Sequence, residues 1–451
     1  MSLRIGAKLR GSETGKGDDT VSWDFETEPE FQEKLDWIAT FVREEIEPLD
    51  LASGAGGIDR TAHRKRVDEL KQEVKDRDLW ACHLGPELGG KGYGQVKLAL
   101  MNEILGRTGS APRIFGAQAP DTGNMEILAH YGTDEQKEKW LEPLLAGQIY
   151  SAYSMTEPHG GSDPTMFVTK AERDGDEWVI NGEKWFTSNG AFATILVVMA
   201  VTNTDVDPHD GTSMFIVPRN TPGVEIVRNV GTGTERLGRG GHAYIRYNDV
   251  RIPAENLLGQ EGKAFVIAQT RLSGGRIHHA MRSVATLHRC VEMMCERALS
   301  RVTKGELLAN KQMVQEQIAD VWTDVQMFRL LVLNAAWKID KYRDYLKVRK
   351  DIAAVKARLP KVLVDTIYTA MHMHGALGVS NEMPFARMWM GAPTMGIADG
   401  PTEVHKVTVA QQVLKEYKPH DGLWPREHIP TKREIALEKV SHWLEAEVGS
   451  F

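Results

Sequence analysis

The sequence has little cysteine, no long apolar run and no excess of positive charge. Three cysteines in 451 residues form an odd, sparse set, which fits a reducing compartment better than a disulfide framework. No stretch approaches the uninterrupted apolar run that a bilayer span requires. The net charge of −7 argues against a general nucleic-acid binder. We therefore expect a cytoplasmic protein with no membrane span and no nucleic-acid partner.

The length exceeds what one ordinary core can organise and predicts two or three packed units. Residues 1–26 have no apolar core between their charges, which excludes a secretory signal and indicates a disordered leader. Residues 27–150 repeat apolar side chains at helical spacing, beginning at Phe31 and Leu35, so we expect a helical N-terminal domain. Pro48 predicts the end of its first helix.

The pattern changes twice further along the chain. Residues 151–262 form short alternating runs separated by turn dipeptides, which predicts a compact sheet or barrel as a middle β-domain. Long helical patterns return over residues 263–415, interrupted at Gly274–Gly275. Residues 416–451 form a C-terminal extension, for which a partner-binding arm and a plain surface tail are equally good interpretations.

One run stands out within the β-rich part, YSMTEPHGGSDP at residues 153–164. Its hydroxyl groups and glycines offer donors on a tight turn, suited to phosphate or flavin carbonyl oxygens. Most such turns bind nothing, so the run needs support from other motifs. Five further motifs follow it: NGEKWFTSNG (181–190), DVRIPAENLLG (249–259), RLSGGRIHHAMR (271–282), RALSRVTKGELLANKQ (297–312) and ADGPTEVHK (398–406).

These six motifs, in this order, resemble the signatures of the acyl-CoA dehydrogenase family. The last motif and RIHHAMR are most similar to a subgroup related to mammalian family members ten and eleven. The resemblance implies a mainly α fold, with a β-barrel middle domain between a helical N-terminal domain and a C-terminal four-helix bundle. It also implies FAD as cofactor, an acyl-CoA substrate, a role in fatty acid β-oxidation and lipid metabolism, and a homodimer or homotetramer that shares its FAD sites.

The resemblance also assigns candidate site residues. The catalytic candidates are Asp399, at the position of the family's base, and Arg276 beside it. Ser162, Gly400 and Gly275 are expected near the substrate. The expected cofactor-binding residues are Tyr153, Met155, Thr156, Gly161, Ser162, Phe186, Ser188, Arg301, Thr303, Gln312, His372, Gly375, Ala376 and Glu403. Phe186, Ser188, His372 and Ala376 replace the family's usual tryptophan, threonine, glutamine and glycine.

The implied reaction is α,β-dehydrogenation of the thioester. Asp399 would remove the α-proton, flavin N5 would take the β-hydride, and the electrons would pass to an electron-transfer flavoprotein. A dry site and hydrogen bonds to the thioester carbonyl would stabilise the developing enolate, and desolvation by the flavin and the acyl chain would raise the pKa of Asp399. Gly274 and Gly275 predict room for a long, bulky or hydroxylated acyl group.

Other interpretations remain open on the sequence alone. Asp399 precedes Gly400 and Pro401 and could simply cap a helix, while Glu403 is a second carboxylate one turn on. Arg276 could be a surface charge. The same fold could host an oxidase or monooxygenase of the nitroalkane-oxidase kind, or a flavin-free binding protein. We expect no metal site, because the adjacent histidines His278 and His279 point apart on a helix.

Overall fold

The computed structural model describes residues 25–54, 59–233, 235–418 and 422–448. All but the last two residues of the expected leader lie outside these ranges. The N-terminal part is helical, as expected. Its helices are α1 (Pro29–Phe41), α2 (Glu47–Gly54), α3 (Arg60–Asp76), α4 (Gly94–Leu105), α5 (Ala111–Ile114), α6 (Asp121–Tyr131), α7 (Asp134–Gln136) and α8 (Glu142–Leu145), with shorter turns η1 (Val42–Ile46), η2 (Pro86–Leu88) and η3 (Lys137–Leu141).

Pro48 does not end the first helix, so that expectation is wrong. A π-helical turn over Val42–Ile46 joins α1 to α2, and the chain stays helical to Gly54. Pro48 is the second residue of α2, where a missing N–H costs little because the wider turn before it already breaks the α-helical hydrogen-bond pattern. The buried side chains of this stretch, including Ile38 and Ile46, continue one apolar face across the join.

The middle part is one eight-stranded sheet with the order β6-β7-β3-β2-β4-β5-β8, and β1 pairs with β4. The sheet is open rather than a closed barrel, because β6 and β8 end the path unpaired with each other. The strands are β1 (Ser151–Ser154), β2 (Lys170–Asp174), β3 (Glu177–Ser188), β4 (Ile195–Val201), β5 (Thr212–Pro218), β6 (Val224–Val230), β7 (His242–Pro253) and β8 (Leu257–Leu258), with turns η4 (Pro164–Met166) and η5 (Ala254–Asn256).

Both faces of the central strands are covered. Alternate residues of β4, such as Leu196 and Val198, join Trp178 of β3 and Tyr247 of β7 in one cluster. The other residues of β4 pack against α6 and the start of α9 in a second cluster. Strand β4 is therefore almost continuously apolar, which is typical of a strand buried on both sides.

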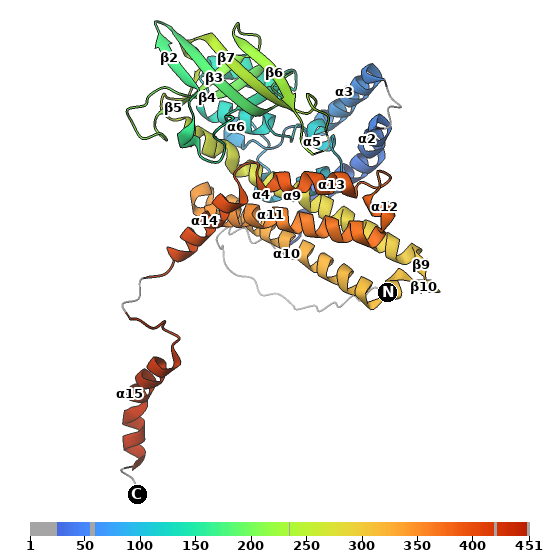
Figure 1. The fold of residues 1–451 in the computed structure, drawn as a ribbon, viewed down its shortest axis with the longest axis vertical. Helices are drawn as coiled ribbons and strands as arrows, with labels where there is room; N and C mark the ends of the chain where they lie inside the picture. The colour runs from blue at the N-terminus through green and yellow to red at the C-terminus, as the bar shows by residue number, and fades with distance from the viewer. Residues whose placement is uncertain (1–24, 55–58, 234, 419–421, 449–451) are drawn as a thin grey trace, which may run out of the picture.

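The C-terminal part is a helical bundle (Figure 1). Its elements are α9 (Ala264–Ser300), β9 (Val302–Thr303), β10 (Glu306–Leu307), η6 (Leu308–Asn310), α10 (Gln312–Tyr342), α11 (Tyr345–His374), α12 (Ala376–Val379), α13 (Phe385–Gly391), η7 (Ala392–Gly396) and α14 (Thr402–Leu414). Helix α9 runs unbroken through Gly274–Gly275, so the expected interruption is wrong. Flanking turns and tertiary packing outweigh the low helix propensity of the two glycines.

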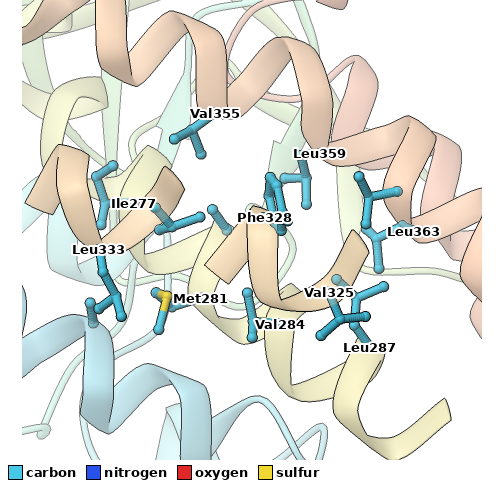
Figure 2. Packing of buried hydrophobic residues seen from close by; sticks show 14 of the residues in the cluster. Ile277, Met281, Val284, Leu287, Val325, Phe328, Leu333, Val355, Leu359 and Leu363 are labelled. Carbon is cyan, nitrogen blue, oxygen red and sulfur yellow. The ribbon is translucent and has the colours of Figure 1, made fainter. Parts of the chain in front are cut away.

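Aliphatic side chains from α9, α10 and α11 interlock in the core of the bundle (Figure 2). Met281 and Val284 of α9 face Phe328 of α10 and Leu359 of α11. Burial of such side chains contributes about 1.5–3 kcal/mol each. This rigid core fixes α9 and α11, the two helices that carry the charged side chains of the candidate site.

The C-terminal extension ends in α15 (Ile429–Val448), a helix that lies apart from the rest of the chain (Figure 1). In the part of the chain that the structure describes, no helix has the length and apolar character needed to cross a bilayer.

Candidate active site

Asp399 lies in a short turn between η7 and α14, and the backbone of this turn is unusual. Asp399 has a φ of 57° and Gly400 a φ of 101°. Aspartate tolerates this left-handed region better than most residues. Gly400 is required sterically, because a Cβ there would lie 2.9 Å from His405 Nε2. We call residues 395–400 the base loop.

Three side chains bond to carbonyl oxygens of the base loop. They are an arginine, a lysine and a histidine, and each is buried or half-buried. Arg276 Nε of α9 donates to the carbonyl oxygen of Asp399 at 3.1 Å, and His405 Nε2 lies 3.2 Å from the same oxygen. Lys356 Nζ of α11 donates to the carbonyl oxygens of Met395 and Ala398, each at 2.8 Å. The loop is therefore fixed through its main chain.

The Asp399 carboxylate has no hydrogen-bond partner among the described residues. Its Oδ2 lies 3.8 Å from His279 Nε2. Burial raises the pKa of Asp399, but the side chains of His279, Arg271, Lys356 and Arg276 together outweigh burial and hold the pKa below its usual value. The expected rise of this pKa through desolvation by the flavin and the acyl chain stays a prediction for the loaded site.

The helix-cap alternative for Asp399 is also wrong. Helix α14 begins at Thr402 with Pro401 as its N-cap, and no side chain caps it. Glu403 lies in the first turn, where its charge suits the helix dipole, and its side chain is exposed. Glu403 is thus not a second carboxylate in the base loop.

His279 and Arg282 form a half-buried pair beside Asp399. Arg282 Nη2 lies 3.3 Å from His279 Nδ1, and Arg282 Nη1 donates to Asn102 Oδ1 at 2.7 Å. Burial, and then the charge of Arg282, lower the pKa of His279 to about 4, so the imidazole is neutral near pH 7. His278 points elsewhere, with Nε2 3.1 Å from Gln95 Oε1.

Four residues around Asp399 are not among those predicted from the sequence: Arg271, His279, Lys356 and His405. Arg276, His279 and Arg282 follow each other at three-residue spacing in RIHHAMR, which places them along one side of a helix. This spacing in the sequence could have indicated that the three side chains lie near one another. Lys356 gave none, because a lysine in an amphipathic helix usually faces solvent, whereas this side chain is 2% exposed.

Arg271 of α9 contacts the sheet, and its charge acts on Asp399. Its guanidinium stacks on the Tyr153 ring of β1 at 3.8 Å from the centroid, and its Nε donates to Asn124 Oδ1 at 2.8 Å. Burial raises the pKa of Tyr153 to about 12, an effect that Arg271 opposes and the charge of Asp399 supports. The Tyr153 hydroxyl is buried without a hydrogen-bond partner among the described residues.

A buried ion pair organises the Gly-rich run after β1. Glu157 Oε1 accepts from Lys184 Nζ of β3 at 2.8 Å, and both side chains are fully buried. Glu157 also accepts from the N–H groups of Val168 and Thr169 at 2.8 and 3.0 Å. Lys184 Nζ donates to the carbonyl oxygen of Met155 as well, at 2.8 Å. These bonds set the backbone path that carries Thr156, Gly161 and Ser162.

A register shift in β3 determines how Phe186 and Ser188 are oriented. Between Lys184 and Thr187 the pairing with β7 slips, and Phe186 takes a φ of 50°. Lys184 and Thr187 are both buried, so the shift reverses the alternation and leaves the Phe186 ring 42% exposed. Ser188 Oγ lies 2.8 Å from His242 Nδ1.

These residues fit the flavin end of FAD. A flavin is a flat aromatic ring with polar edges, and the donor set here combines an exposed aromatic face at Phe186 with hydroxyl groups at Thr156, Ser162 and Ser188. The unpaired buried hydroxyl of Tyr153 is a further polar group that a ligand could satisfy.

A third group of expected site residues lies elsewhere. Arg301, Thr303 and Gln312 surround β9 and β10, and His372, Gly375 and Ala376 lie where α11 meets α12. These elements are at one end of the bundle and α14 is at the other (Figure 1). Gly375 has a φ of 64°, and a Cβ there would meet no atom within 4 Å, so this turn is open. One chain alone does not bring this group to Asp399.

The two remaining predicted residues lie on α9 and in the base loop. Gly275 directly precedes Arg276, and a Cβ on Gly275 would contact nothing within 4 Å. Gly400 follows Asp399 in the base loop. No group of three metal-ligating side chains occurs in residues 25–54, 59–233, 235–418 and 422–448.

Comparison with known proteins agrees with this architecture. Family models match residues 28–148 (acyl-CoA dehydrogenase, N-terminal domain), 152–250 (middle domain) and 262–414 (C-terminal domain). "Probable acyl-CoA dehydrogenase FadE2" of Mycobacterium tuberculosis is 43% identical over 82% of this chain and 90% of its own length. Human "Acyl-CoA dehydrogenase family member 11" is 37% identical over 85% of this chain, which spans about half (50%) of that protein.

A solved structure shows the same fold. Butyryl-CoA dehydrogenase from Megasphaera elsdenii superposes with a TM-score of 0.74 at 27% identity, covering 87% of this chain and 100% of that one. The chain belongs to the acyl-CoA dehydrogenase family. Membership of this family supports an oxidoreductase activity and implies FAD as cofactor and an acyl-CoA as substrate.

Proposed function

We propose that this chain oxidises an acyl-CoA thioester to the 2-enoyl-CoA, with Asp399 removing the α-proton. The observation that carries the proposal is the placement of Asp399. Its carbonyl oxygen is held by Arg276 and His405, while its carboxylate accepts no hydrogen bond from the described residues. A carboxylate that is fixed in place but unpaired is free to accept a proton.

The main chain of the base loop supports the same reaction. The N–H of Asp399 has no hydrogen-bond partner among the described residues, so it can donate to the thioester carbonyl oxygen as negative charge develops there. The cations around the loop, Arg276 and Lys356, favour that negative charge. The low pKa of Asp399 keeps it ionised, and a bound acyl chain that excludes water would then strengthen it as a base.

We propose that FAD binds beside this loop and that its flavin ring is held by Tyr153, Met155, Thr156, Gly161, Ser162, Phe186 and Ser188. Bound FAD supplies the acceptor for the hydrogen and electron pair that leave the β-carbon. Ion pair Glu157–Lys184 would fix the loop that carries Thr156 and Ser162, and Arg271 would hold Tyr153 against the same site.

The residues at the far end of the bundle imply a partner subunit. We propose that Arg301, Thr303, Gln312, His372, Gly375 and Ala376 bind the diphosphate and adenosine end of FAD held by a second copy, in a dimer or tetramer. Glu403 would contribute to the cofactor site from α14. An electron-transfer flavoprotein is the proposed acceptor, and β-oxidation in the cytoplasm the proposed context.

The two glycines of α9, Gly274 and Gly275, bear on the size of the acyl group that the site could accept. Gly274 packs closely, since a Cβ there would lie 3.2 Å from the Tyr345 hydroxyl, whereas the position of Gly275 is open. The open position is next to Arg276, so it adjoins the base loop. This supports room for a long, bulky or hydroxylated acyl group, and sole preference for butyryl-CoA would contradict it.

An anaerobic titration tests the proposal. The purified protein should be yellow and should lose its flavin absorbance when one acyl-CoA of a graded series is added, with the 2-enoyl-CoA as product. Rapid reoxidation by air with formation of peroxide would instead indicate an oxidase. A colourless protein that binds no added FAD would indicate a binding protein and end the proposal.

A further inference from the structure

Ser188 and His242 form a hydrogen-bonded pair across neighbouring strands. They are register partners of β3 and β7, and Ser188 Oγ lies 2.8 Å from His242 Nδ1. The ring of Phe186 lies next to the His242 ring, with 5.8 Å between the centroids and 51° between the planes. The register shift in β3 thus places an aromatic ring, a hydroxyl and an imidazole together.

The imidazole of His242 is neutral near pH 7. Burial lowers its pKa, and the carboxylate of Glu235, in the loop before β7, opposes this only in part. No other charged group from the described parts of β3, β6 or the 231–241 loop acts on it. A neutral imidazole has one N–H and one bare nitrogen, so its Nδ1 can either donate to Ser188 or accept from it.

A serine hydroxyl has one hydrogen and can donate in only one direction. If Nδ1 carries the proton, it donates to Ser188 Oγ, and Ser188 can offer its own hydrogen to a bound group. If the proton is on Nε2, Ser188 donates to Nδ1 and presents only its oxygen. His242 is half-buried, so its protons can exchange with solvent and the two arrangements can interconvert.

We propose that His242 is a positioning residue that sets the direction of the Ser188 hydrogen bond toward the flavin. This rests on the proposed function, in which Ser188 helps to hold the flavin ring, and it takes Ser188 to lie near flavin N5, the position that the family resemblance gives to the threonine it replaces. That nitrogen is an acceptor in oxidised flavin and carries an N–H in reduced flavin. The Ser188–His242 pair can therefore complement both forms, donating to the first and accepting from the second.

The bound flavin's midpoint potential tests the proposal independently of turnover. His242→Leu removes the partner of Ser188, and the balance of reduced to oxidised flavin should shift by about tenfold, which is about 30 mV for a two-electron couple. His242→Gln, whose amide can donate or accept, should restore most of this shift. In the Ser188→Ala background, His242→Leu should have no further effect.

The outcomes separate the possibilities. An unchanged potential in His242→Leu overturns the proposal, as does an equal shift with and without the Ser188 hydroxyl. Lower thermal stability with an unchanged potential would indicate a purely structural role and also overturns it. If the unsubstituted chain binds no flavin, the proposed function itself fails, and the assignment of His242 fails with it.

Discussion

Arg276 Nε donates to the main-chain carbonyl oxygen of Asp399, at 3.1 Å, and not to its carboxylate. The distinction matters because a hydrogen bond to the carboxylate would stabilise its ionised form and make it a weaker base. Through the carbonyl, Arg276 fixes where Asp399 is without occupying its oxygens. Its charge still acts on Asp399 and contributes to the lowered pKa.

Arg276→Lys should lower kcat about 100-fold, the size of effect that a misplaced catalytic group produces. Lysine keeps the positive charge but cannot place a donor where Nε now lies. Stability should change little, because His405 still bonds the same carbonyl oxygen. Stopped-flow kinetics and thermal melts measure both quantities. An unchanged kcat would show that Arg276 does not position the base.

Lys356→Met should destabilise the fold by about 1–3 kcal/mol, because the carbonyl oxygens of Met395 and Ala398 lose their shared donor. It also removes a cation that lowers the pKa of Asp399, so the acid limb of the kcat/KM profile should move to higher pH. The matched control is Lys347→Met on the same helix, which is exposed. Equal effects from both substitutions would contradict the role of Lys356.

Breaking the buried pair Glu157–Lys184 should cost about 3–5 kcal/mol and weaken FAD retention. Glu157→Gln leaves the Lys184 charge buried and loosens the loop before Val168. The exposed pair Lys170–Glu172, also 2.8 Å apart, is the control, and its disruption should cost less than about 1 kcal/mol. Denaturant unfolding and flavin release measure the two effects. Similar costs for both pairs would refute the ordering role of Glu157.

The free energy of unfolding should fall as the pH drops from about 6.5 to about 4. Burial lowers the pKa of His83, His279 and His405 to about 4 and that of His278 to about 3. In this window the unfolded chain binds protons that the folded chain does not, so stability is lost on acidification.

His83→Gln should flatten this slope by up to about 1.4 kcal/mol per pH unit. Urea unfolding of this variant and of the unsubstituted protein at pH 7, 6 and 5 gives the slopes. If the variant keeps the original slope, the buried His83 does not contribute to the acid sensitivity.

The order of helical, β and helical parts was predictable, because apolar spacing and turn dipeptides report local geometry directly. The continuity of α9 through Gly274–Gly275 was not, since packing on both sides outweighs local propensity. The helix end predicted at Pro48 was also wrong, because the π-helical turn before Pro48 makes its missing N–H tolerable. The openness of the sheet depends on pairing between distant strands, which no local pattern encodes.

The candidate site, too, was predictable only in part. Asp399 and Arg276 were found through motif resemblance, and their contact was expected. Lys356 donates to carbonyl oxygens of a different element, and Arg271 stacks on Tyr153, which lies more than a hundred positions away in the sequence. Only the folded chain reveals these contacts. The direction of the Asp399 pKa depends on that same cluster, and a single motif could not predict it.

The most direct test of the account is the anaerobic rate of flavin bleaching by a reactive acyl-CoA in Asp399→Asn, compared with the unsubstituted protein. The amide has nearly the shape of the carboxylate but cannot take up the α-proton. The account predicts retained flavin and a bleaching rate lower by several orders of magnitude, with partial activity in Asp399→Glu. Bleaching of Asp399→Asn at a rate close to that of the unsubstituted protein would show that another group is the base.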